Sequence, residues 1–179
     1  MSCPQTLAGI AKDCSANMGG IVRVLLANKD DVASITLTNG EITAITMRNT
    51  AASGDPVYAT FKEYLFRPNT GNMVSEYQID DAAGTKFVQT TLAMVFSRME
   101  TAKRLEISAI ALADAVAIVE DANGKYWYLG YDFPLTMSAG GGDTGTARAD
   151  RNGYTLSLVD NSKELPMEVS DSIIDGLLD

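Results

Sequence analysis

The chain has 179 residues, of which 46% are hydrophobic, enough for one domain with a sizeable core. It carries 14 Lys and Arg residues against 23 Asp and Glu residues, and the resulting net charge of −9 argues against a protein that binds nucleic acid through phosphate contacts. It contains no histidine, which excludes Ser-His-Asp and Cys-His catalysis and zinc sites with histidine ligands.

The chain shows no signal for a membrane or for secretion. No apolar run is long enough to cross a bilayer, and the N-terminus lacks the basic-then-apolar order of a signal peptide. We therefore expect synthesis and folding in a cytoplasm. In such a reducing compartment, Cys3 and Cys14 are expected to be free thiols.

Residues 1–20 have no strong periodicity and are expected to form an N-terminal arm. Strands follow at residues 21–27, 33–38 and 41–47. Between the last two lies Asn39-Gly40, a dipeptide that can take a positive φ at both central positions of a hairpin. An aromatic-rich strand is expected at residues 57–66.

Residues 73–130 contain the clearest pattern. We expect a hairpin of strands 73–79 and 86–97, a helix at 100–114, and a second hairpin of strands 116–121 and 125–130. The strand at 86–97 alternates. Its apolar face is formed by Val88, Leu92, Met94 and Phe96 and includes Thr90 as an exception. The opposite, polar face contains Gln89, Thr91 and Ser97, with Ala93 and Val95 as exceptions.

The expected helix at 100–114 has apolar residues at helical spacing. Leu105, Ala109 and Leu112 follow the i, i+4, i+7 pattern, and Ile107 and Ile110 widen the apolar stripe. We therefore predict that Leu105 and Leu112 face the core of the domain or a neighbouring subunit.

The last third of the chain is expected to hold a short strand at 135–138 and a strand at 154–159. Between them, the glycine-rich run at 139–146 predicts a flexible loop, with no core of its own up to residue 149. Residues 160–179 are predicted to form an acidic C-terminal arm, either solvated or docked on a basic partner. The whole pattern predicts a mainly β (α+β) fold, an antiparallel β-sandwich or barrel over residues 21–159 with one flanking helix.

No group of residues assembles into a catalytic, metal or cofactor site. The acidic pairs Asp30-Asp31, Asp80-Asp81 and Glu120-Asp121 lie beside expected turns, where carboxylates favour local hydrogen bonds over metal binding. In the aromatic run at 126–128, Trp127 is predicted to pack inside and the two tyrosines to line the other face. We expect a protein that is not an enzyme and needs no cofactor.

Several motifs carry a resemblance to a family. Asp13-Cys14 with Gly19-Gly20-Ile21, residues 87–102, residues 120–130 and residues 145–154 are similar to structural proteins of tailed phages that infect Bacteroidetes-type hosts. The order hairpin, helix, hairpin also resembles the tail tube (major tail) protein family. The resemblance implies a subunit made in the host bacterial cytoplasm that assembles into stacked rings, commonly hexameric, in the virion tail. DNA would pass through the channel without specific binding.

The assembly hypothesis rests on the hairpin at 73–97. Its polar face would line a wet channel, and Glu76, Asp80 and Asp81 would repel phosphate. The predicted assembly residues are Val74, Glu76, Gln78, Asp80, Asp81, Gln89, Thr91, Ala93, Val95, Leu105 and Leu112. The alternative is another non-enzymatic virion component, such as a neck or ring protein, a head decoration protein or a fibre-associated protein.

Overall fold

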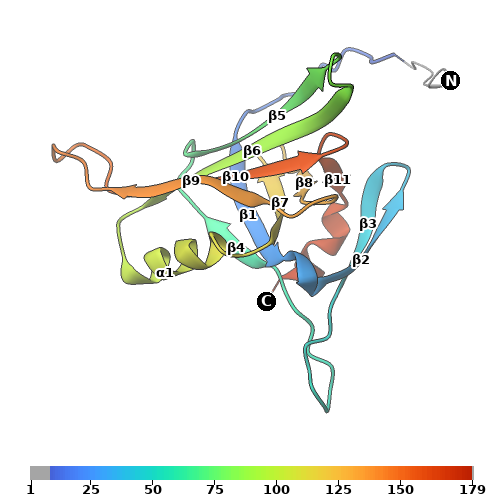
Figure 1. Ribbon diagram of the computed structural model, residues 1–179, viewed down its shortest axis with the longest axis horizontal. Helices are drawn as coiled ribbons and strands as arrows, with labels where there is room; N and C mark the ends of the chain where they lie inside the picture. Colours follow the sequence, from blue (N-terminus) through green and yellow to red (C-terminus); the bar gives the residue numbers. More distant parts are fainter. Residues whose placement is uncertain (1–8, 179) are drawn as a thin grey trace.

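The computed structural model describes residues 9–178, which form two β-sheets and one α-helix (Figure 1). The fold is therefore mainly β with a flanking helix, as predicted. The seven-stranded sheet has the order β2 (Val32–Thr38), β3 (Glu41–Met47), β11 (Met167–Val169), β8 (Tyr126–Leu129), β7 (Ala115–Asp121), β1 (Ile21–Asn28) and β4 (Lys62–Leu65). The four-stranded sheet has the order β5 (Gly71–Asp80), β6 (Thr85–Ser97), β10 (Gly153–Ser162) and β9 (Thr136–Asp143).

Local turn chemistry explains the β2–β3 hairpin. Asn39 and Gly40 have φ values of 54° and 86°, the positive angles that the sequence predicted for this turn. Short 3-10 segments complete the secondary structure at Lys29–Asp31, Asp171–Ile173 and Asp175–Leu177. The expected strand at 57–66 is shorter than predicted, because pairing there is limited to β4 and to isolated bridges at Tyr58 and Phe61.

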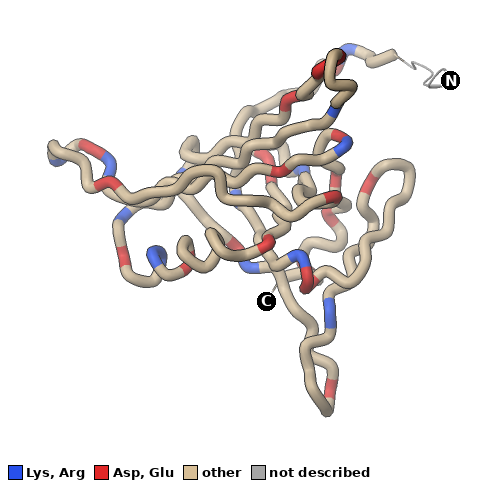
Figure 2. The backbone as a smooth tube through the Cα atoms, viewed as in Figure 1, with Lys and Arg blue, Asp and Glu red and all other residues tan. Residues whose placement is uncertain are grey.

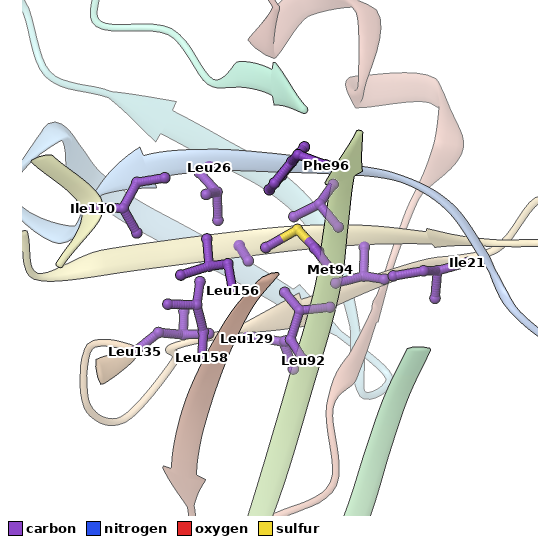
Figure 3. Close-up of a cluster of buried hydrophobic side chains, with 13 residues drawn as sticks. Ile21, Leu26, Leu92, Met94, Phe96, Ile110, Leu129, Leu135, Leu156 and Leu158 are labelled. Atoms are coloured by element: carbon purple, nitrogen blue, oxygen red, sulfur yellow. The ribbon is translucent and has the colours of Figure 1, made fainter. Parts of the chain in front are cut away.

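The first hydrophobic cluster lies between the two sheets (Figure 3). The alternation predicted for residues 86–97 is confirmed, because Leu92, Met94 and Phe96 of β6 are buried in this cluster. Leu156 and Leu158 of β10 pack beside them. Full burial of such side chains contributes about 1.5–3 kcal/mol each, so this cluster holds the two sheets together.

A second cluster covers the other face of the seven-stranded sheet. In β7, Ala117 and Val119 enter the first cluster whereas Val116 and Ile118 enter the second. The remaining buried members of the second cluster are Leu25, Ile42, Met47, Phe61, Tyr128, Val169, Ile174 and Leu177.

The C-terminal segment corrects a prediction. Residues 160–179 were expected to form an acidic arm, but Asp160 belongs to β10 and is 2% exposed. Val169 of β11 pairs with β3 and β8, and Ile174 and Leu177 are buried. The apolar residues between the carboxylates decide the outcome, because they complete the second cluster.

Helix α1 (Thr101–Ile110) is shorter than predicted and turned differently. Ile110 is buried and Ile107 packs against the first cluster. Leu105 is 56% exposed and Leu112 is 92% exposed, so neither faces the domain core. The other alternative, that they face a neighbouring subunit, stays a prediction. Leu112 is exposed because α1 ends before it, so that it lies in the turn after the helix.

The glycine-rich run also differs from its prediction. Residues 139–143 belong to strand β9, and a loop begins only after Asp143. A Cβ atom on Gly140 would lie 1.9 Å from the Met137 Cε, and one on Gly142 would lie 2.7 Å from the Met99 Cε. These glycines therefore make room for packed side chains instead of supplying flexibility.

In the aromatic run, the inside and outside positions are the reverse of those predicted. Tyr128 is 1% exposed and lies in the second cluster, while Trp127 is only partly buried. The Trp127 indole donates to the Asp121 carboxylate at 3.0 Å. Asp121 also accepts from the backbone amides of Asn123 and Lys125, which confirms the turn interpretation of this acid.

The N-terminal arm is described from Gly9 onward. Residues 9–20 are exposed and form neither strand nor helix, and the Met18 amide donates to the Asn123 side chain. Cys14 is a free, exposed cysteine, whereas Cys3 lies outside the described residues. Among the described residues, no helix combines the length and the apolar character needed to cross a bilayer.

Candidate functional site

The predicted assembly residues of β5 and β6 lie on one surface. In β6, Gln89, Thr91, Ala93 and Val95 alternate with residues of the first cluster and therefore point away from the core. Val74 of β5 pairs with Thr91, and Glu76 pairs with Gln89, so both lie on the same side. We name this surface the outer face of the four-stranded sheet. Gln78 belongs to it as well, opposite Phe87.

Strands β10 and β9 complete the outer face with residues that the sequence reasoning missed. Their register places Thr155, Ser157, Val159, Asn161, Ala139 and Gly141 on it. The Gln89 amide donates to the Asn161 side chain at 3.2 Å across this face. The alternation of residues 154–159 carried the signal, but only the pairing of β10 with β6 shows that both strands share a surface.

The outer face mixes polar and apolar side chains and carries little charge. Glu76 is the ionisable residue in its middle, whereas Asp80 and Asp143, which the register places on the same side, lie at strand ends. Figure 2 shows the charged residues mainly near the ends of the strands. The predicted acids Asp80 and Asp81 lie at the tip of the β5–β6 hairpin, away from the centre of the face. The Asp80 carboxylate accepts hydrogen bonds from the amides of Ala82 and Ala83, at 2.9 and 3.0 Å, and so caps its own turn.

Within residues 9–178, the four-stranded sheet ends in two open edges. β5 and β9 are its outermost strands, and neither contains proline. The pairings β5–β6, β6–β10 and β10–β9 are all antiparallel, so β5 and β9 run in opposite directions. Only β5 of the predicted 73–97 hairpin is therefore available to a neighbour. Thr91 lies in β6, which is paired on both sides.

The two predicted helix residues do not join this surface. Leu105 and Leu112 lie on or just after α1, which packs beside the sheets through Ile107 and Ile110 (Figure 1). Leu105 and Leu112 thus form a separate exposed apolar position on the subunit.

The acidic pairs serve structural contacts. Glu120 forms an ion pair with Arg23, which also binds Glu63 at 2.7 Å. These hydrogen bonds, that of Glu63 foremost, raise the pKa of Arg23. Burial pushes the pKa of Asp121 upward, but hydrogen bonds from Trp127, Lys125 and Asn123 outweigh it and lower the pKa overall. In residues 9–178, no three Cys, Asp or Glu side chains gather in a way that could hold a metal ion.

Comparison with known proteins yields no match: no family model, no curated protein and no solved structure matches this chain.

Proposed function

We propose that this protein is a virion structural protein, the subunit of a phage tail tube, which assembles into rings that stack around a DNA channel. The observation that supports this most is the pair of open, oppositely directed edge strands β5 and β9 on one sheet. If β5 of one subunit pairs with β9 of the next, the antiparallel pattern continues without interruption. Closure of the ring then removes every open edge of this sheet.

The size of such a ring suits DNA. Six copies of a four-stranded sheet would contribute about 24 strands, and at about 4.8 Å between strands and a tilt of about 40° the barrel would be roughly 48 Å across. Side chains that point inward from opposite sides of the barrel narrow this channel, but it remains wide enough for a duplex.

The chemistry of the outer face suits a channel lining. Its residues include no Lys or Arg, so they offer no cation to phosphate, and Glu76 repels it. Threonine, serine, glutamine and asparagine keep the surface wet. DNA would thus slide past this face without being held.

The test uses two proline variants at neighbouring positions of β5, Val74→Pro and Ser75→Pro. Adjacent residues of an edge strand present their amides to opposite sides, one to β6 and one to the open edge. One variant should lose a bond within the subunit and melt at a lower temperature. The other should keep the monomer's circular dichroism and thermal stability but form no rings in negative-stain micrographs.

If both folded variants assemble as the parent does, the β5 edge is not a subunit contact. The alternative of a neck, decoration or fibre-associated protein would then be favoured. A parent protein that stays monomeric at high concentration would refute the tube proposal directly.

A further inference from the structure

A cavity of about 250 Å³ opens at the far end of β10, away from the outer face. Its walls come from β2, β8 and the segment after β8, and from the end of β10 through the start of β11. They include Tyr128, Tyr131, Asp160 and Leu165. The proposed ring closure uses none of these residues. The cavity therefore needs an explanation of its own.

Two buried polar atoms of this cavity lack partners. Among the described residues, neither the Tyr128 hydroxyl nor the Asp160 Oδ1 has a hydrogen-bond partner, although their residues are only 1% and 2% exposed. The rest of the carboxyl group is not isolated: Oδ2 accepts from the Ser162 hydroxyl at 2.7 Å, and the Gly130 amide also acts on the group and lowers its pKa. An unpaired buried polar atom costs about 1–3 kcal/mol, so a ligand that donates hydrogen bonds to both atoms would be stabilised here.

The charge and the walls of the cavity favour a cation. Asp132, Asp160 and Glu164 line it, against Lys163 alone. Lys163 is already engaged, because its ammonium lies 3.4 Å from the Asp132 carboxylate. Lys29 is not a lining residue; its ammonium donates to the carbonyls of Gly130 and Tyr131, and its charge also attracts the Asp160 carboxylate. Even with Lys29 included, three carboxylates face two ammonium groups.

A guanidinium group fits these features best. It has several fixed N–H donors for a carboxylate and a hydroxyl, and its flat faces pack well against tyrosine rings. The same group binds water more weakly than an ammonium does, so it enters a half-enclosed cavity at lower cost.

The chain itself carries an arginine in a suitable position. The loop between β9 and β10 extends away from the body of the subunit (Figures 1 and 2). Arg148 lies within it between two alanines, is exposed, and forms no ion pair within residues 9–178. The loop is preorganised, because the Asp150 carboxylate accepts from the amides of Thr146 and Ala147 at 2.8 and 2.6 Å.

This loop and the cavity lie at opposite ends of β10. The strand begins at Gly153, next to the loop, and Asp160 lies seven residues further on, a separation of roughly 23 Å at about 3.3 Å per residue. Arg148 therefore cannot reach the cavity of its own subunit. A contact between two copies would run head to tail along the strand direction, which is how a stack grows.

We propose that Arg148 of one copy inserts into the Tyr128–Asp160 cavity of a second copy and so joins successive rings. The inference rests on the proposed function for the direction of the stack. It assigns ring closure to the edges of β5 and β9, and stacking to the loop and the cavity.

The test uses the full chain and the variants Arg148→Ala, Asp160→Asn and Tyr128→Phe. Each should lower the affinity between rings by about tenfold or more, measured by sedimentation, and shorten tubes in micrographs while single rings persist. The double variant Arg148→Ala with Asp160→Asn should lower the affinity between rings no further than the more damaging single variant does. The reason is that both substitutions remove the same contact. Thermal melts verify that each monomer folds.

Arg151→Ala is the matched control, since it removes the same charge from the same loop. If it weakens stacking as much as Arg148→Ala does, the effect is general charge and the inference is wrong. Independent, additive losses in the double variant, or tubes of normal length with Asp160→Asn, also overturn it while leaving ring closure intact. Head-to-tail filaments without closed rings would support this contact and refute the tube proposal.

Discussion

The orientation of α1 can be tested with two truncations on the same helix, Ile110→Ala and Leu105→Ala. Each removes three carbon atoms, worth about 2.4 kcal/mol in transfer free energy when fully buried, at about 0.8 kcal/mol per carbon. Ile110 is 7% exposed, so nearly all of this is lost, and the cavity raises the total to about 2–4 kcal/mol. Leu105 is 56% exposed, and its loss should be about 1 kcal/mol.

For a domain of this size, 1 kcal/mol shifts the melting temperature by about 2–4 °C. Ile110→Ala should therefore melt roughly 4–16 °C below the parent, and Leu105→Ala roughly 2–4 °C below it. Circular dichroism on dilute, monomeric protein measures both. If Leu105→Ala costs as much as Ile110→Ala, the helix faces the other way. If Leu105→Ala leaves the monomer nearly unchanged but impairs assembly, Leu105 belongs to a subunit contact.

Three more predictions concern other parts of the chain. A Cβ atom on Gly153 would lie 2.1 Å from the carbonyl oxygen of Phe96, so Gly153→Ala should destabilise the monomer by about 1–3 kcal/mol in urea unfolding. A Cβ atom on Gly141 would have nothing within 4 Å, so Gly141→Ala should be neutral or slightly stabilising. Equal effects at the two glycines would contradict the packing of β10 on β6. Burial raises the pKa of Asp160 above its ordinary 3.8. At a pH between the pKa of the unfolded state and that of the folded state, the folded protein holds a proton that the unfolded chain has released, so stability falls as the pH rises through this range. Asp160→Asn should therefore melt at a higher temperature than the parent at neutral pH, and the difference should shrink towards pH 3.8, although the same variant is expected to stack poorly. A variant that melts at a lower temperature at neutral pH would show that the charge is stabilising. With Cys3 and Cys14 changed to serine, the pair Glu76→Cys on β5 and Ala139→Cys on β9 should form disulfides between subunits when oxidised. Denaturing gels should then show a ladder of cross-linked oligomers that ends at the ring size. A ladder that stops at dimers would argue against closure through these edges.

The features predicted best from sequence are those that local chemistry determines. The alternation in β6 identified its buried residues, and Asn39-Gly40 identified a hairpin whose two positive φ angles follow from the residues themselves. The outer face followed from the same alternation, so Val74, Glu76, Gln89 and Thr91 were grouped correctly.

The features predicted wrongly depend on distant partners. Both Leu105 and Ile107 belong to apolar stripes of one short helix, and only the surface beneath α1 decides which stripe is buried. In the sequence, the glycines of β9 have the composition of a loop. Only the structure shows that Met137 and Met99 occupy the space beside them. The Tyr128–Asp160 cavity gave no sequence signal, because its residues come from strands far apart in the chain.

The place of β11 in the seven-stranded sheet has a consequence for how the chain folds during synthesis. Among the described strands, the β2–β3 hairpin joins the rest of this sheet through β11, which lies between β3 and β8. The ribosome makes about 5–20 residues per second, so the hairpin emerges on the order of ten seconds before its partner strand exists. During that interval Ile42 and Met47 have no cover and the edge of β3 is open, which exposes the nascent chain to aggregation and to chaperones. Because Val169 seals that edge so late, unfinished chains lack a closed core and should be kept out of any assembly.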